Sequence, residues 1–360
     1  MKVTIISSKG HWKNGWISHY EDLKVMMAAL ERNRIMVRHV EVDCLEELHN
    51  ILSTISSEEL ILPNAYYVDV NRGSNEKVWL VDIIESYNLP VIGSNKTTLQ
   101  NVLRKGVCQS ILKANNIPVP EFAVVKTTEV GKIPDILNQS NVSYPAVVKL
   151  TAESGSKGMT DDSLVRNQKD AIDQIQQMIT TYQGDVIIED FLPSEDITVG
   201  YYTNSEGEPQ LLTTYYKVDS KPGVTSIMGH NERFMKWGGE KHMPEVKEKY
   251  ILDQVKKIVP KICEVLNIRD VTRVDGRLDN NGQLRIFDVN GFPALVFPES
   301  VQVKQAMVCF PHINKMKVYE ALLNTIVMAA AERYDIKIPE SVQVLNLFQL
   351  ANETKLSVAT

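Results

Sequence analysis

Short apolar segments alternate with amphipathic helical segments over the first 95 residues of the chain. This pattern predicts strands over 3–7, 37–42, 59–63 and 90–93, and helices over 20–32, 45–54 and 77–87. Strands that alternate with helices favour a parallel sheet covered on both faces. We therefore expect a Rossmann-like α/β domain here, although the first turn, 7–11, lacks the glycine pattern of dinucleotide-binding proteins.

The next segment predicts a helix over 98–115, strands ending near 126, 150 and 192, and a helix over 132–139. The strand that ends in Lys149-Leu150 runs into a loop of small residues, 151–159. Backbone N–H groups of such a loop can bind phosphate oxygens, and Lys149 adds a positive charge. A surface loop with a chance lysine is the alternative, because the loop does not match the Walker pattern.

From residue 196 to about 300 the pattern changes to successive strands, which favours an antiparallel sheet. We expect strands over 197–202 and 210–216, a long loop over 220–243 and a helix over 245–266. A helix over 318–333 and a polar tail after about 340 complete the chain.

One hairpin carries candidate chemistry. Two alternating strands between Arg273 and Asn290 are joined by the turn 279–282, and pairing them brings Arg273, Asp275, Asp288 and Asn290 close together. Carboxylate and amide oxygens suit Mg²⁺ beside a nucleotide's phosphates, and an arginine can stabilise charge on a reacting oxygen. An ordinary hairpin with a solvated face is the alternative.

Composition indicates an ordinary globular protein that acts on small molecules. The 360 residues are 43% hydrophobic and 23% charged, enough for two or three domains. A net charge of −6 gives no basic field for nucleic acid. We see no secretion signal and no membrane span of about 18 apolar residues. The four cysteines follow no metal or disulfide spacing, so we expect a cytoplasmic protein.

Taken in order, five motifs resemble those of a known family. They are Lys105 before the turn 117–119, Pro145-x-x-x-Lys149 before the loop ending at Met159, the segment 188–192, Arg273-x-Asp275, and Asp288-x-Asn290. Together they resemble the ATP-grasp superfamily, and within it the D-alanine–D-alanine ligase branch. The resemblance implies a three-domain α/β architecture with an N-terminal domain at 1–96, a central α+β domain at 97–191, a catalytic α+β domain at 192–320, and a helix and tail at 321–360.

The resemblance also implies roles for individual residues. Lys105 and Lys149 match lysines that contact ATP phosphates, Asp196 an acid that binds the ribose, and Arg273 the residue that stabilises the acyl phosphate and the tetrahedral intermediate. Lys217 matches a further catalytic phosphate contact. The expected metal ligands for Mg²⁺ (Mn²⁺ is an alternative) are Asp275, Asp288 and Asn290. The phosphate-covering flap and the adenine-binding linker match Glu153, Ser154, Gly155, Ser156, Glu189, Asp190, Phe191 and Leu192.

Three departures from the family pattern concern the substrates. The glutamate that holds the first D-alanine in these ligases has no counterpart between Ser7 and Tyr20, Asp288 replaces a glutamate, and Ala294 replaces a glycine of the oxyanion site. His19, Tyr20, Ala294 and Ser300 are candidate substrate contacts. An aromatic helix start packed on the sheet is the alternative for the segment 10–20.

These implications favour an ATP- and Mg-dependent ligase that phosphorylates an acceptor, most simply a carboxylate, and joins it to the amino group of an amino acid. The product is not expected to be D-alanyl-D-alanine. A second possibility is imine formation on a phosphorylated, enolised carbonyl, as in mycosporine-like amino acid biosynthesis. A third is a nucleotide-binding regulator with decayed activity, against which the retained motif residues argue. The resemblance also implies a homodimer.

Overall fold

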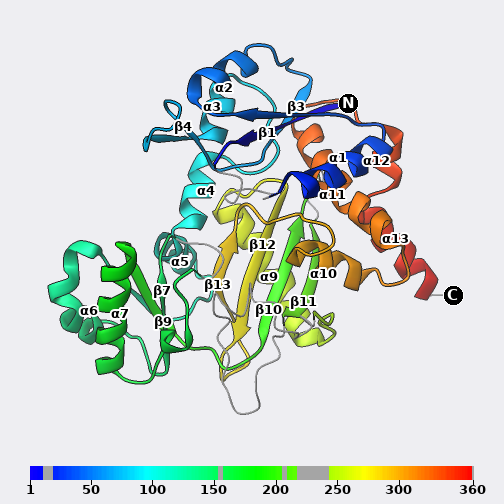
Figure 1. Cartoon of the computed structure of the whole chain (residues 1–360). Helices are drawn as coiled ribbons and strands as arrows, with labels where there is room; N and C mark the ends of the chain where they lie inside the picture. The colour runs from blue at the N-terminus through cyan, green and yellow to red at the C-terminus, as the bar shows by residue number, and fades with distance from the viewer. Residues whose placement is uncertain (11–18, 153–156, 205–208, 217–242, 359–360) are drawn as a thin grey trace.

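The computed structural model describes residues 1–10, 19–152, 157–204, 209–216 and 243–358 (Figure 1). Within these ranges the strands form one parallel sheet, two antiparallel sheets and a small hairpin. Each larger sheet falls within one of the three segments expected to form domains, although the domain boundaries themselves stay a prediction. In the part of the chain that is described, no helix is both long and apolar enough to cross a membrane.

The N-terminal sheet is parallel, as its alternating pattern predicted. Its strand order is β2-β1-β3, with β1 (Lys2–Ser8) between β2 (Met36–Val42) and β3 (Glu59–Pro63). Every residue of β3 is buried, which fits the apolar run typical of a covered parallel strand. The helices of this region are α1 (Tyr20–Arg32), α2 (Leu45–Leu52) and α3 (Leu80–Ser86).

The predicted helix over 77–87 is wrong in its first turn. Residues Lys77–Trp79 form β5, which pairs with β4 (Tyr67–Asp69), and α3 begins only at Leu80. Trp79 keeps an extended backbone and packs its ring 4.8 Å from that of Tyr67, the residue opposite it. This cross-strand aromatic pair stabilises the hairpin, and no local pattern in the sequence reveals it.

The central sheet is antiparallel in the order β6-β9-β7-β8. Helices α6 and α7 pack on it through a buried apolar cluster. The elements are α4 (Lys96–Leu103), α5 (Lys105–Ala114), β6 (Phe122–Val125), the 3-10 turn η2 (Thr127–Lys132), α6 (Ile133–Gln139), β7 (Ala146–Leu150), η3 (Asp161–Ser163), β8 (Leu164–Val165), α7 (Gln168–Tyr182) and β9 (Val186–Asp190).

The predicted single helix over 98–115 is also wrong. The chain breaks at Arg104, whose extended backbone (φ −90°, ψ 91°) separates α4 from α5. The N–H of Lys105 then donates to the carbonyl of Thr151, at the end of β7, over 2.8 Å. This bond ties the first turn of α5, and therefore Lys105, to the central sheet.

The third sheet is antiparallel, as predicted, with the order β11-β10-β12-β13. Its strands are β10 (Asp196–Tyr202), β11 (Gln210–Tyr216), β12 (Val271–Leu278) and β13 (Leu284–Asn290). Helix α9 (Lys249–Val265) packs on one face through the apolar side chains of alternate strand residues. Helix α10 (Val301–Cys309) lies on the other face, where its glutamines reach β10 and β12. Figure 1 shows both helices beside this sheet.

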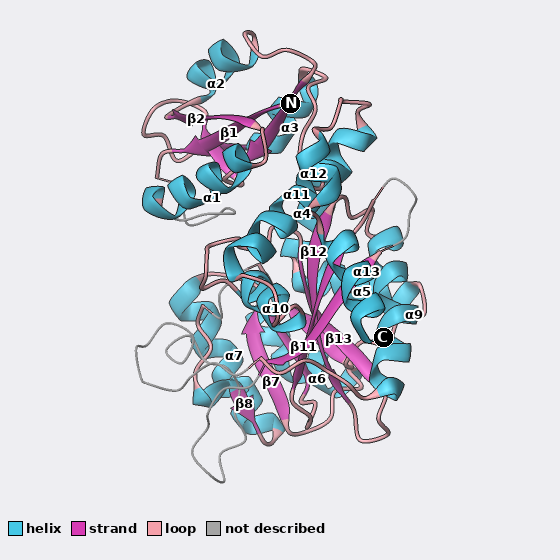
Figure 2. Cartoon of the chain, turned by 90° about the vertical axis from the view of Figure 1, so that its right-hand side faces the viewer, coloured by secondary structure: helices cyan, strands magenta, loops and turns pink. Residues whose placement is uncertain are grey.

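The predicted polar tail after residue 340 is wrong, because the chain continues in two helices. Helix α11 (Lys315–Arg333) is followed by α12 (Glu340–Val344) and α13 (Leu347–Val358). The segment contains spaced apolar residues, and Val342, Leu347 and Leu350 are all buried against the core around α11. Figure 2 shows α11 between the N-terminal sheet and the rest of the molecule.

Candidate functional site

The hairpin β12–β13 forms with the register that the sequence pattern required. Arg273 lies opposite Asn290 and Asp275 lies opposite Asp288, so all four side chains share one face of the sheet. A bulge follows between Asp275 and Gly276. A Cβ atom at Gly276 would lie 2.8 Å from the carbonyl oxygen of Arg285, so only glycine fits this close approach.

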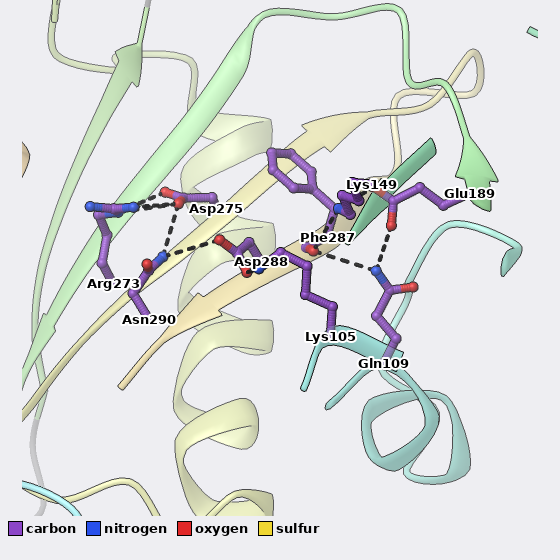
Figure 3. A network of polar contacts seen from close by, with 9 residues as sticks. All are labelled: Lys105, Gln109, Lys149, Glu189, Arg273, Asp275, Phe287, Asp288 and Asn290. Atoms are coloured by element: carbon purple, nitrogen blue, oxygen red, sulfur yellow. Dashed lines mark hydrogen bonds and ion pairs between the residues drawn. The ribbon is translucent and has the colours of Figure 1, made fainter. Parts of the chain in front are cut away.

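Arg273, Asp275 and Asn290 form one hydrogen-bonded group (Figure 3). The Arg273 guanidinium donates to Asp275 through Nη2 (3.0 Å) and Nε (3.1 Å), and Asn290 Nδ2 donates to the same carboxylate over 3.1 Å. Burial opposes the charge on Arg273, but the Asp275 carboxylate outweighs it and raises the pKa of the guanidinium. The arginine therefore stays charged and oriented at the sheet face.

Lys105 faces the other carboxylate of the hairpin. Its Nζ lies 3.2 Å from Asp288 Oδ1, and both side chains are largely buried. Burial opposes ionisation of Asp288, but the positive charges of Lys105, Lys149 and Arg273 outweigh it and hold the pKa of this carboxyl below its usual value. Asp288 is therefore an anion at neutral pH, available to a cation.

Lys149 and Glu189 form a second buried ion pair across the adjacent strands β7 and β9. Gln109 donates to the same Glu189 carboxylate over 2.6 Å, and both Lys149 and Gln109 lie 3.4 Å from the carbonyl oxygen of Phe287 on β13. Figure 3 shows this network joining the central sheet to the β12–β13 hairpin. Sequence reasoning missed Gln109, although its position one helical turn after Lys105 was a usable signal.

The donor set on the hairpin fits a hard divalent cation. Asn290 Nδ2 lies 3.1 Å from Asp275 Oδ2 and 3.5 Å from Asp288 Oδ2, so one ion could reach all three side chains. Within the described ranges, no group of three or more His, Cys, Asp or Glu side chains is placed to hold a metal ion. At this hairpin the oxygen donors are two carboxylates and the Asn290 amide. Its nitrogen points at both carboxylates, and coordination would require the amide to turn its oxygen inward.

The predicted adenine-binding linker is held by an arginine that sequence reasoning also missed. Arg277 forms an ion pair with Asp196, donates to the carbonyl of Leu192 over 3.0 Å and lies 5.5 Å from the centre of the Phe191 ring. Asp190 is used differently, because its carboxylate accepts from the N–H of Ser143 over 2.7 Å. The linker residues are therefore fixed beside β12 before any ligand binds.

The remaining candidates are less closely connected. Glu153, Ser154, Gly155, Ser156 and Lys217 lie outside the described residues. His19 and Tyr20 start α1, where the Tyr20 ring contacts His39 and Lys24. Ala294 is exposed in the loop after β13, and Ser300 precedes α10 with its hydroxyl buried and unpartnered. The structure does not join any of these described residues to the charged network by a hydrogen bond or ion pair.

An aromatic cluster not foreseen from the sequence borders Asp288. The Tyr66 ring lies 5.1 Å from Phe292 and 5.9 Å from Trp79, which links the β4–β5 hairpin to the loop after Asn290. Burial raises the pKa of Tyr66, and the neighbouring Tyr67 and Asp288 raise it further. The N-terminal region thus contributes rings next to the charged site.

Comparisons with known proteins agree with this geometry. The chain is 23% identical over 249 residues to the D-alanine–D-alanine ligase of Mannheimia succiniciproducens, covering 66% of this chain and 74% of that ligase. It is 26% identical over 223 residues to D-alanine–D-alanine ligase B of Clostridium perfringens, covering 61% of this chain and 68% of that protein.

Solved structures show the same fold. The D-alanine–D-alanine ligase of Bacillus anthracis complexed with ATP superposes with a TM-score of 0.64 at 16% identity, over 93% of this chain and 99% of that one. The VanG D-Ala:D-Ser ligase of Enterococcus faecalis superposes with a TM-score of 0.64 at 15% identity, over 91% of this chain and 99% of that one. The expected ATP-grasp α/β fold is confirmed. The family model of the D-ala D-ala ligase C-terminus matches residues 111–304, more than half of the chain, which therefore belongs to the D-alanine–D-alanine ligase family.

Proposed function

We propose that this protein is an ATP-dependent ligase that activates an acceptor by phosphorylation and joins it to the amino group of an amino acid. The observation that carries this proposal is the convergence of Lys105, Lys149 and Arg273 with the oxygen donors of the β12–β13 hairpin. The positive side chains can offset the negative charge of a nucleotide's phosphates. The carboxylate and amide oxygens can coordinate a divalent ion beside those phosphates. Membership of a ligase family supports the same reading.

In the proposed reaction, each charged side chain would stabilise the opposite charge on a substrate or intermediate. A carboxylate oxygen of the acceptor would take the terminal phosphoryl group, and ADP would leave with Lys105 and Lys149 offsetting its charge. The amine nitrogen would then attack the activated carbon, and phosphate would leave as the nitrogen loses a proton. The amine attack would create an oxyanion, and Arg273, on the same sheet face as Asp275, would stabilise it. Mg²⁺, when held by Asp275, Asp288 and Asn290, would neutralise charge on the phosphates.

We propose that the substrates differ from two D-alanines. The sequence between Ser7 and Tyr20 contains no acidic residue that could hold an ammonium group. At the described end of β1, the Asn64 amide donates to the Ser7 hydroxyl over 3.0 Å, and His39 Nε2 lies 3.0 Å from the same hydroxyl. The aromatic cluster of Tyr66, Trp79 and Phe292 beside Asp288 favours a second candidate. In this alternative the phosphoryl group goes to the enol oxygen of an unsaturated carbonyl compound, and the amino acid displaces phosphate to give an imine.

The test is release of ADP and phosphate from Mg-ATP with D- and L-amino acids, alone and paired with carboxylate acceptors or a conjugated enaminone. Phosphate release that requires both an amino acid and a separate acceptor supports the proposal and identifies the acceptor class. Turnover with D-alanine alone would contradict the altered substrate. ATP binding without turnover in every combination would instead favour a regulator. An Asp275→Asn variant keeps the side-chain shape but loses the charge, and should abolish the release of ADP and phosphate that this site catalyses.

A further inference from the structure

Asp275 has a neutral hydrogen-bond partner that belongs to a different strand. The Thr198 hydroxyl donates to Asp275 Oδ1 over 2.6 Å, and the two residues are directly paired in the register of β10 and β12. Thr198 is 2% exposed, so its hydroxyl makes this bond in a nearly dry environment. A hydrogen bond to a carboxylate in such surroundings is stronger than one in water.

Helix α10 fixes the backbone that carries Thr198. Gln305 is fully buried, and its Nε2 donates to the Thr198 carbonyl over 2.8 Å and to the Thr214 hydroxyl over 3.2 Å. Gly200 makes room for this glutamine, because a Cβ atom there would lie 2.6 Å from Gln305 Oε1. Gln302 binds the neighbouring strand in the same way, through the Thr272 carbonyl over 3.2 Å. Two glutamines of one helix therefore hold β10, which carries Thr198, and β12, which carries Asp275.

The two oxygens of Asp275 have different sets of partners. Oδ2 accepts from Arg273 (Nη2 and Nε) and from Asn290 Nδ2, the groups that would exchange partners when a cation arrives. Oδ1 accepts from the Thr198 hydroxyl over 2.6 Å and, over a longer 3.2 Å, from Arg273 Nε. Because the sheet and α10 determine the position of Thr198, its short bond to Oδ1 restrains rotation of the carboxylate and favours one direction of Oδ2 towards the cation position.

We propose that Thr198 is a positioning residue that orients Asp275 as a metal ligand, and that Gln305 of α10 holds Thr198 in place. This inference rests on the proposed function, since it assumes that Asp275 binds the divalent ion. Partners of this kind, which hydrogen-bond to a ligand rather than to the metal, commonly change metal affinity by about 10- to 100-fold when they are removed.

The test is a measurement of the Mn²⁺ dissociation constant by electron paramagnetic resonance, in the presence of a non-hydrolysable ATP analogue. Thr198→Val keeps the shape and removes the hydroxyl, and should raise the Mn²⁺ dissociation constant about 10-fold. Thr198→Ser restores the hydroxyl and should return most of the affinity. Thr325→Val is the matched control, because it also removes a buried, hydrogen-bonded threonine hydroxyl, but on α11, and should leave Mn²⁺ binding unchanged.

The outcomes separate the two proposals. If the unmodified protein binds Mn²⁺ and Thr198→Val binds it equally well, the positioning role is wrong and the ligase proposal stands. If the unmodified protein binds no Mn²⁺ with the analogue, the metal site itself fails and both proposals fall. Should Thr198→Val not fold, Gln305→Met decides, because it removes the bond that holds the Thr198 carbonyl while the Thr198 hydroxyl itself is retained, and it should also weaken Mn²⁺ binding. Unchanged Mn²⁺ affinity in a folded Gln305→Met protein would overturn the role of α10.

Discussion

Each cation of the site lies against a carboxylate: Arg273 against Asp275, Lys105 against Asp288, and Lys149 against Glu189. The charged side chains of the site therefore neutralise one another, which offsets much of the cost of burying them. A phosphate and a divalent ion that enter together would exchange these partners, with the anion taking the cations and the metal taking the carboxylates. Entry of either one alone would leave charges unpaired.

Replacement of Arg273 tests the residue that faces the reacting oxygen. Arg273→Ala should lower turnover about 100-fold, which is the scale found when an oxyanion donor is removed. Among the described residues of the β12–β13 hairpin, Arg273 is the cation that lies beside Asp275 and Asn290. Affinity for an ATP analogue should change little, since Lys105 and Lys149 remain. Steady-state turnover and calorimetric binding measure the two effects. The exposed Arg166→Ala is the control, and an equal loss of nucleotide affinity and turnover in Arg273→Ala would contradict the role.

At the scale of elements, the break between α4 and α5 directs Lys105 into the site. The start of α5 is packed so closely on β6 that a Cβ atom at Gly106 would lie 2.5 Å from Val124 Cγ2. A larger side chain at this contact would push α5 away from β6. The position of the first turn of α5 therefore depends on the absence of a side chain at Gly106. The orientation of Lys105 therefore depends on a glycine that touches no ligand.

Gly106→Ala should lower stability by about 1 kcal/mol, because the cost of overpacking exceeds the helix propensity gained from alanine. It should also weaken binding of an ATP analogue by displacing Lys105. Thermal unfolding and calorimetry measure both effects. Gly131→Ala is the matched control, since a Cβ atom there meets nothing within 4 Å and should change neither quantity. A Gly106→Ala protein with full stability and nucleotide affinity would show that Val124 moves aside without cost.

The β12–β13 hairpin and the α4–α5 break differ in how far the local sequence predicts them. The β12–β13 hairpin was predictable because its turn and its alternation are local, and its register then placed Arg273 and Asp275 correctly. The break at Arg104 was not, because the nearby Gly106 lies inside α5 and not at the break, and the long-range bond from Lys105 to Thr151 stabilises it. Arg277 and Tyr66 were missed for the same reason, since their partners are distant in sequence.

At the scale of the whole molecule, one buried carboxylate joins three regions. Asp270, just before β12, accepts from the N–H of Gly93 over 2.6 Å and forms an ion pair with Arg333 at the end of α11. Arg333 also donates to the Val91 carbonyl over 2.6 Å. The N-terminal region, the sheet of β10 to β13 and the C-terminal helices therefore meet at this group. It stabilises the arrangement that sets the aromatic cluster beside Asp288.

Asp270→Asn removes the charge and keeps the shape, and asparagine tolerates the positive φ of 61° at this position. The variant should unfold at lower urea concentration, with a loss of about 3 kcal/mol, because it leaves the partly buried Arg333 without its counter-charge. Fluorescence-monitored urea unfolding measures the loss. Lys249→Gln, which breaks an exposed pair with Asp253, should leave the curve unchanged. If both variants unfold like the unmodified protein, the three regions are held together by apolar packing around α11 and not by this ion pair. If Asp270→Asn unfolds in two separate steps, the N-terminal region has been uncoupled from the sheet of β10 to β13, and that outcome would identify Asp270 as the residue that connects them.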